Sequence, residues 1–279
     1  MRWLPLPPDL VAFALRLYRR TEHAELSLIS AGVAFFGFLA IFPAVAAIIA
    51  IWGTVFDPTV IRTQIELLKG FVPPDAYSLL VAQVEGLLAV RGPQLGWTTL
   101  ASTILALWSA RAGVAALIRG LNAIHHLPPR YGIWHQVQAL VLTFVLIALA
   151  LTAMALAVIV PLVIVFLPLG LVETLVLELL NLTLGLCLVV MAVGLLYRFG
   201  PNRDAGKKHP LFTQGLLIAL ILWALVSRGL VLYFANFASY NQVYGSIGAV
   251  VALLMWLYLS AYAVLLGAAL NAELERPKY

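Results

Sequence analysis

The chain has 279 residues, of which 63% are hydrophobic and only 10% are charged, and its mean hydropathy is +1.01. A soluble domain of this length has too little interior to bury so much apolar surface, so the composition excludes an ordinary water-soluble protein and predicts a polytopic membrane protein. The net charge of +5 is typical of basic cytoplasmic loops in such proteins, and nucleic acid is not an expected partner.

The N-terminal residues 1–27 predict a cytoplasmic amphipathic segment. In "PDLVAFALRLYRR", Leu10, Phe13 and Leu17 fall on one helical face. The other side carries the three arginines of the stretch, Arg16, Arg19 and Arg20. Such a helix is typical of the inner membrane surface, where its apolar face enters the interface and its cations meet anionic head groups.

Six apolar stretches are each long enough to cross a bilayer as a helix, which takes ~20 residues. They cover residues 28–52, 95–118, 137–167, 171–197, 211–235 and 243–270. Because these runs are long and continuous rather than alternating, they favour helices over barrel strands. The fold class predicted is all-α, a polytopic membrane helical bundle with about six transmembrane helices plus amphipathic interfacial helices. The membrane domain is expected to cover residues 28–271.

Basic residues are unevenly distributed among the connections. Most lie in the N-terminal segment, the second-to-third connection, the loop 198–210 and the tail 272–279, which share one side if the chain crosses six times. The opposite connection, residues 53–94, has fewer cations, and its "PTVIRTQIELLKG" and "PPDAYSLLVAQVEGLLAV" stretches predict amphipathic helices. By the positive-inside rule, both termini are expected in the cytoplasm.

One arginine interrupts the apolar run "LWALVSRGLVLYF". At 1.5 Å per residue, Arg228 lies ~12 Å below the outer end of the fifth stretch, and Glu178 lies ~10 Å deep in the fourth. Because charges inside a membrane need partners, one interpretation is a structural ion pair with Glu178 or Glu173, or a snorkelling arginine. The other is an anion or head-group site in an outward-facing cavity. Its mouth would be lined by the polar residues that precede the sixth stretch, Tyr240, Asn241 and Tyr244.

A second candidate site lies at the inner end of the second stretch, in "ALWSARAGVAALIRGLNAIHHLPPR". Arg111 lies near the inner boundary, and Arg119 and Asn122 follow beyond it. Two interpretations stay open. These residues line a phosphate-binding inner vestibule, or the two arginines only anchor the helix at the interface.

Small residues recur at helical spacing in the sixth stretch. Ser260, Ala263 and Gly267 form one stripe, a pattern that lets helix backbones approach closely in a membrane. This stripe predicts a helix-packing face rather than a binding site.

Motifs of known enzymes are missing from the sequence. It has no HExxH, no GxSxG and no Walker loop. The adjacent His125 and His126 would point about 100° apart on a helix, which is poor geometry for holding one metal ion. No catalytic residue, metal site or cofactor is therefore predicted, and the single cysteine, Cys187, cannot form an intrachain disulfide.

Four stretches together resemble the YihY/virulence factor BrkB family: "AGVAFFGFLAIFP", "ALWSARAGVAALIRGLN", "YRFGPNRDAGKKHP" and "YGSIGAVVALLMWLYLSAYAVLLGAALNAELE". The resemblance covers roughly residues 20–275 and implies a multi-pass protein of the bacterial inner (plasma) membrane with about six spans. Members were once labelled ribonuclease BN, a label generally regarded as a misassignment, and transport of ions or lipids has been proposed for them. Phe35 and Phe36 stand where many members carry tyrosine.

Two functions fit these observations. The first is a transporter or translocase of a lipid, lipid-linked anion or small ion, in which Arg228 attracts an anionic group and Glu173 or Glu178 acts as counter-ion or proton carrier. The alternative is a non-catalytic membrane scaffold for cell-envelope assembly, in which Arg228 is a structural tie. The expected partners are membrane lipids, and the sequence leaves room for a homo-oligomer.

Overall fold

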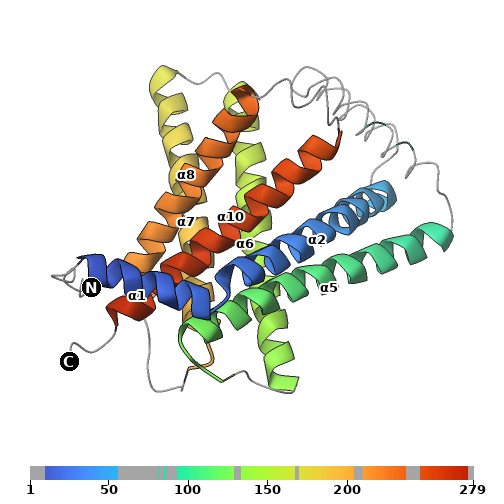
Figure 1. Ribbon diagram of the computed structural model, residues 1–279. Helices are drawn as coiled ribbons and strands as arrows, with labels where there is room; N and C mark the ends of the chain where they lie inside the picture. The colour runs from blue at the N-terminus through green and yellow to red at the C-terminus, as the bar shows by residue number, and fades with distance from the viewer. Residues whose placement is uncertain are drawn as a thin grey trace. The chain divides into compact units, whose positions relative to one another are not determined.

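The computed structural model describes residues 10–55, 81, 85, 93–128, 133–166, 170–203, 210–236 and 246–275. These residues are almost entirely helical and contain no strand, which confirms the all-α prediction. The helices are labelled in Figure 1 and are α1 (Leu10–His23), α2 (Leu26–Val55), α5 (Pro93–Ile124), α6 (Ile133–Phe166), α7 (Leu171–Phe199), α8 (Gln214–Asn236) and α10 (Ser246–Leu274).

Each of the six apolar stretches coincides with one long helix. In the described part of the chain, four stretches are long and apolar enough to span a membrane: Leu100–Ile124, Gln136–Ala153, Leu175–Phe199 and Val250–Leu274. The pair α1–α2, bent by 53°, adds a fifth if it is counted as one span. Helix α8 has a shorter apolar part, Gln214–Leu230, but its 23 residues extend ~35 Å, more than the ~30 Å of a hydrocarbon core. About six spans is therefore compatible with the fold.

Several predicted features lie outside the described residues. They include most of the connection 53–94 with its two amphipathic stretches, and part of the loop 198–210. They also include three members of the first candidate site, Tyr240, Asn241 and Tyr244. These predictions stay open.

The chain divides into two compact units. Unit 2 comprises Phe36–Ala110, and in it the later part of α2 runs beside the early part of α5 (Figure 1). The rings of Phe36 and Trp108 meet edge to face, with centroids 6.3 Å apart, a favoured aromatic geometry. Unit 1 comprises Met1–Phe35 and Arg111–Tyr279, and it holds the remaining helices.

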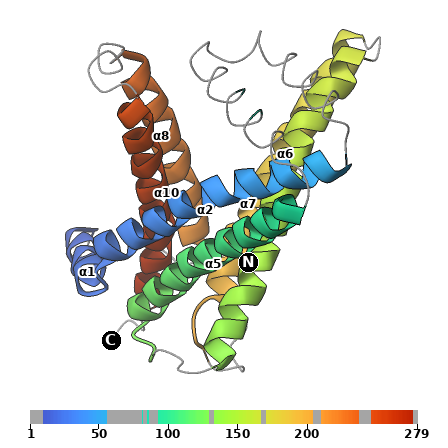
Figure 2. The same cartoon turned by 90° about the vertical axis from the view of Figure 1, so that its right-hand side faces the viewer.

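Two helix pairs make up most of unit 1. Helix α8 lies along α10, and α6 lies along α7, as Figure 2 shows. Between α8 and α10 the backbones nearly touch, because a Cβ atom built on Gly215 would lie only 2.0 Å from the carbonyl oxygen of Gly267. Ala263, one turn earlier on α10, is also buried. The small-residue stripe is thus a packing face, as the sequence predicts.

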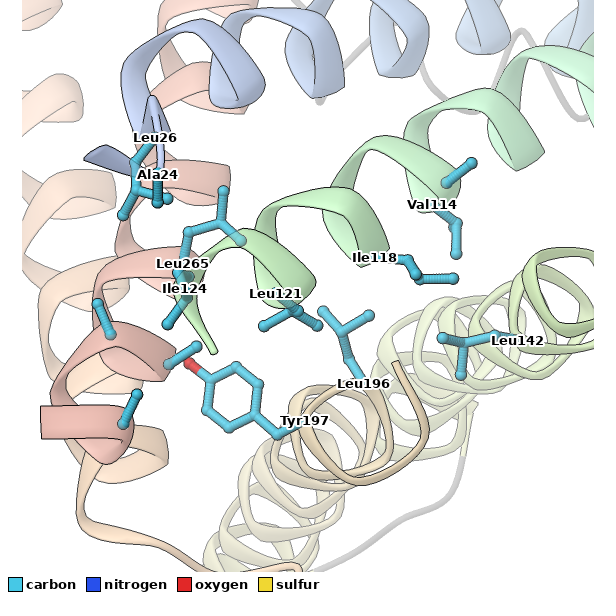
Figure 3. Close-up of a cluster of buried hydrophobic side chains, with 14 of the residues drawn as sticks. Ala24, Leu26, Val114, Ile118, Leu121, Ile124, Leu142, Leu196, Tyr197 and Leu265 are labelled. Atoms are coloured by element: carbon cyan, nitrogen blue, oxygen red, sulfur yellow. The ribbon is translucent and has the colours of Figure 1, made fainter. Parts of the chain in front are cut away.

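The main cluster of buried apolar side chains in unit 1 surrounds the C-terminal turns of α5 (Figure 3). Ile118, Leu121 and Ile124 have no exposed surface, and α10 contributes Leu265, which is equally buried. Gly120 lets Leu265 pack against α5, since a Cβ there would lie 2.9 Å from a Leu265 methyl carbon. Because lipid tails are as apolar as these side chains, close van der Waals packing rather than water exclusion holds the parts of the cluster inside the membrane.

Large apolar side chains are also exposed along the helices. Leu175 and Leu182 on α7 and Leu225 on α8 keep 63–70% of their surface accessible. Water-soluble proteins rarely expose contiguous apolar surface on this scale, whereas a helix facing lipid does so without cost. These faces of α7 and α8 are therefore the expected lipid-contacting surface of unit 1.

A tight turn joins α1 to α2. Glu25 has a φ of 49°, in the left-handed region that side chains other than glycine rarely adopt. The flanking Ala24 and Leu26 are buried, at 4% and 1% exposure, so packing on both sides holds the turn in place. The turn lets α1 leave the axis of α2 and run across the end of α10.

Candidate functional site

The polar side chains of unit 1 gather where α5, α7 and α10 end and α8 begins. We call this region the polar end and define it by the residues whose side chains form its contacts: Arg20, Asn122, His125, Asn202, Arg203, Thr213, Asn271, Glu273 and Glu275. Helix termini leave carbonyl and N–H groups without helical partners, and this region supplies many of those partners. Its contacts are described below, helix by helix.

Helix α1 is held to α10 by a buried ion pair. The side chains of Arg20 and Glu273 are 7% and 2% exposed, and two guanidinium nitrogens lie 3.1 and 3.2 Å from Glu273 Oε2. A third, Nη1, donates to the carbonyl oxygen of Ile124 at 2.6 Å, in the last turn of α5. One guanidinium therefore joins three helices and neutralises the negative end of α5.

Arg16 makes a second, more exposed contact with the same carboxylate. Its Nε donates to Glu273 Oε1 at 2.8 Å, while its side chain stays 44% exposed. The sequence-based expectation that the arginines of α1 face lipid head groups is thus wrong for Arg20, and Arg16 also bonds Glu273. The reason is tertiary, because a carboxylate 253 residues away along the chain lies beneath this face of α1.

Asn122 fixes the segment that follows α7. Its Oδ1 accepts a hydrogen bond from the backbone N–H of Asn202 at 2.6 Å, and Asn202 Nδ2 donates to the carbonyl of Pro128 at 3.0 Å. At 5% exposure Asn122 is buried. Gln138, on α6, donates to the carbonyls of Phe199 and Gly200 and so satisfies the C-terminus of α7.

Arg203 forms the charged centre of the region. Its Nη2 lies 2.6 Å from His125 Nε2 and 3.1 Å from Nδ1, and 3.9 Å from Glu275 Oε2. Burial lowers the pKa of the Arg203 guanidinium, and the nearby Glu275 carboxylate opposes that shift. The cavity beside these groups measures only about 10 Å³, room for roughly one water molecule. This part of the polar end is packed rather than hollow.

The start of α8 is tied to the end of α10 by Asn271. Its Oδ1 accepts from the N–H of Gly215 at 2.7 Å, and its Nδ2 donates to Thr213 Oγ1 at 2.8 Å. An orphan N–H at the first turn of α8 is thereby satisfied. Since the same level of the helices holds the Gly215–Gly267 contact, α8 and α10 are joined there by both packing and hydrogen bonds.

The structure places the charged members of the first candidate site on α7 and α8. Arg228 is exposed on α8, and Glu173 and Glu178 are exposed on α7. Among the residues that the structure describes, no ion pair joins Arg228 to either carboxylate. A Cβ on Gly170 would lie 2.5 Å from Glu173 Oε2, so this carboxylate folds back over the N-terminus of α7, where the helix dipole favours negative charge.

The second candidate group is split. Asn122 belongs to the polar end, whereas Arg119 is exposed and Arg111 is half-buried. Neither arginine forms an ion pair with another residue in the described ranges. The structure therefore brings Asn122 together with Asn202 rather than with the two arginines.

Sequence reasoning did not anticipate most of the polar end. Asn271 and Glu273 stand in "LNAELE", at the end of an apolar span, and their polarity alone was a signal that something must pair with them. The partners Arg20 and Arg203 come from distant parts of the chain, so sequence spacing could not identify them. In the described part of the molecule, no three His, Cys, Asp or Glu side chains lie close enough to hold a metal ion.

Comparison with known sequences identifies the family of the chain. The sequence pattern of the virulence factor BrkB family matches residues 17–279. The chain belongs to the BrkB family. This finding confirms the resemblance noted from the sequence.

Two groups of proteins are similar in sequence to this BrkB-family protein. YfkH of Bacillus subtilis (strain 168), named as a ribonuclease-like protein, is 27% identical over 273 residues, which cover 96% of this chain and 97% of YfkH. UPF0761 membrane proteins of Xanthomonas campestris pv. campestris (strain B100) and Xanthomonas axonopodis pv. citri (strain 306) are 37% identical over 89 residues. That match covers 32% of this chain and 20–21% of theirs. No solved structure matches the chain.

Proposed function

We propose that this BrkB-family membrane protein moves a lipid with an anionic head group across the bacterial inner membrane. The observation that supports the proposal is Arg228, an exposed cation on the apolar helix α8, without an ion-pair partner among the described residues. A charged side chain at the centre of a span costs ~2.5–3.5 kcal/mol on insertion scales. An anionic ligand that reaches Arg228 would offset this cost.

The depth of Arg228 agrees with such a role. A Cβ atom built on Gly194 of α7 would lie 3.5 Å from a methyl carbon of Leu216 on α8, which gives a common reference level for the two helices. Arg228 lies 12 residues beyond Leu216, ~18 Å along α8, and Glu178 lies 16 residues from Gly194, ~24 Å along α7. The cation and the carboxylate therefore differ in depth by ~6 Å, and Arg228, ~18 Å from the reference level, lies inside a ~30 Å hydrocarbon core. We assign Glu178, with Glu173 nearer the end of α7, as counter-ion or proton carrier.

The polar end would then face the cytoplasm. The Arg20–Glu273 pair brings the N-terminal and C-terminal helices to one end of unit 1, as six crossings require. Arg198, in the last turn of α7, and Arg203 also lie at this end, and cations favour the cytoplasmic side. Cysteine labelling from either side of the membrane, at residues introduced before α1 and after α10, would test this orientation.

We propose transport rather than hydrolysis. The ribonuclease-like name belongs to YfkH, and the sequence of this chain carries no metal-hydrolase or nucleophile motif that would support carrying the name over. Incubation of the purified protein with RNA and Mn²⁺ or Mg²⁺ should give no cleavage above a buffer control.

The test is lipid translocation in proteoliposomes. Wild type should move a fluorescent anionic phospholipid between leaflets, and Arg228→Ala should lose that activity while its thermal unfolding midpoint stays close to wild type. Gly229→Ala is the matched control, because a Cβ there meets nothing within 4 Å, and it should transport normally. If wild type moves no lipid, and Arg228→Ala only melts earlier, the proposal fails and a scaffold role gains support.

A further inference from the structure

An apolar groove of about 670 Å³ runs between α7 and α8. Such a volume lies within the ~300–1,000 Å³ range of ligand sites in proteins. Its walls carry mainly aliphatic side chains, Leu186 and Val190 from α7 and Leu217, Leu220, Ile221 and Ala224 from α8. Several of these side chains are half-exposed, Ile221 at 50% and Leu186 at 54%, so the groove opens toward the lipid-facing surface.

The length of the groove matches one leaflet. Along α8 it runs from Thr213 to Ala224, 11 residues or ~16 Å. The hydrocarbon core of a bilayer is ~30 Å thick, so one leaflet accounts for about half of it. Along α7, Leu186 and Val190 lie 13 and 9 residues before Phe199, ~14–20 Å from the end of that helix. The groove thus runs along α8 from the polar end, and α7 lines only the part of it farthest from that end.

Polar side chains close the boundary end of the groove. Thr213, Asn271 and Glu275 line it there, and the Arg203 guanidinium lies 3.9 Å from the Glu275 carboxylate. The groove therefore changes from aliphatic to polar and charged along its length. A phospholipid changes from acyl chain to phosphate in the same direction and over a similar distance.

The walls of the groove favour an apolar occupant. Water is a poor occupant, because aliphatic walls offer it almost no hydrogen bonds.

We propose that this groove binds one acyl chain of a phospholipid from the leaflet at the polar end, with the polar head group beside Thr213 and Asn271. The inference deepens the proposed transport function, on which it rests for its role: the groove is the site where the lipid enters. Arg228 lies on the same helix, four residues beyond Ala224, and so at the far end of the groove. The substrate is then a lipid with a hydrocarbon tail rather than a free ion.

Photo-crosslinking tests the site directly. The full-length protein is reconstituted in vesicles of phosphatidylglycerol and phosphatidylethanolamine that contain a little phosphatidylglycerol with a diazirine on one acyl chain. After irradiation, mass spectrometry maps the labelled residues. Labels should concentrate on the groove walls, at Leu186, Leu217 and Ile221. Even labelling of the exposed apolar residues of α7 and α8 would mean ordinary boundary lipid and would overturn the proposal.

A pair of neighbouring variants sharpens the test. Ala224→Trp places an indole in the groove and should lower labelling of its walls roughly tenfold. Leu225→Trp is the control, because Leu225 is 63% exposed and does not line the groove, and its labelling should equal wild type. Unchanged labelling in folded Ala224→Trp would overturn the proposal. If that variant does not fold, the label map of the wild-type chain decides alone.

Arg228→Ala separates this inference from the proposed function. The variant should keep wild-type labelling of the groove while it loses translocation. Groove labelling without any translocation by the wild-type protein would refute the transport proposal and leave the lipid site standing. Translocation with evenly spread labels would do the reverse.

Discussion

Removing one member of the Arg20–Glu273 pair should destabilise the protein far more than removing both. Glu273→Met leaves a guanidinium that is 7% exposed with no carboxylate beside it, although its hydrogen bond to the Ile124 carbonyl can persist. Arg20→Met combined with Glu273→Met removes both charges and fills the space with two flexible apolar side chains. Breaking a buried pair typically costs ~3–5 kcal/mol, whereas replacing the whole pair by apolar residues is often close to neutral.

The size of the effect can be worked out from the contacts. For a chain of this size, each kcal/mol shifts the unfolding midpoint by ~2–4 °C, so Glu273→Met should lower it by about 6–20 °C. The double variant loses the donor to Ile124, a cost of ~1–3 kcal/mol, and should therefore fall between the single variant and wild type. Arg16→Ala is the control. Arg16 contacts the same carboxylate but is 44% exposed, so its loss should cost no more than ~1 kcal/mol.

Thermal unfolding of the purified proteins in detergent micelles, followed by tryptophan fluorescence, provides the measurement. The diagnostic result is the order of midpoints, with wild type and Arg16→Ala highest, the double variant next and Glu273→Met lowest. A double variant that unfolds at or below the midpoint of Glu273→Met would refute the reasoning. It would show that the two charges do not act as a pair in the folded protein.

Three further outcomes are expected. Gly215→Ala should lower the unfolding midpoint sharply, because its Cβ would overlap a carbonyl of α10. Gly229→Ala should leave the midpoint unchanged or raise it slightly, since alanine stabilises a helix by ~1 kcal/mol relative to glycine. Equal effects of the two variants would contradict the close backbone contact at Gly215. Asn122→Ala should cost ~1–3 kcal/mol in denaturant unfolding, since the N–H of Asn202 loses its acceptor, and a neutral result would mean that water replaces the side chain. Cys187, exposed on α7, should react with a membrane-permeant maleimide but not with a charged, water-soluble one; fast reaction with the charged reagent would place this face of α7 in water.

The helices could be predicted from the sequence because each depends on a local property. An apolar run of ~20 residues or more has to satisfy its backbone internally in lipid, and a helix does so with its own carbonyls. The stretch predicted at residues 171–197 is the helix Leu171–Phe199, and residues 243–270 lie almost wholly in the helix Ser246–Leu274. The stripe of Ser260, Ala263 and Gly267 also depends on spacing alone, so its packing role was predictable too.

The polar end could not be predicted in the same way, because its contacts join residues that are far apart in the sequence. Arg20 pairs with a residue 253 positions away, and Asn122 with one 80 positions away. From the sequence, Arg20 was indistinguishable from the other cations of an amphipathic surface helix, and it was expected at the lipid head groups. The depth of a residue along a span follows from counting residues, so the levels of Arg228 and Glu178 could be estimated from the sequence. The direction in which each side chain points depends on tertiary packing and could not.

The Arg20–Glu273 contact also sets the order in which the molecule can be completed during synthesis. Arg20 leaves the ribosome early, whereas its partner follows 253 residues later, roughly 13–50 s at typical elongation rates. During that interval the guanidinium can reach the carbonyl of Ile124 once α5 has been made, but it has no carboxylate beside it. The last span supplies that carboxylate and completes the docking of α1. A nascent chain that stalls before the last span leaves the Arg20 charge without its ion-pair partner, a feature by which a membrane protease could recognise an unfinished molecule.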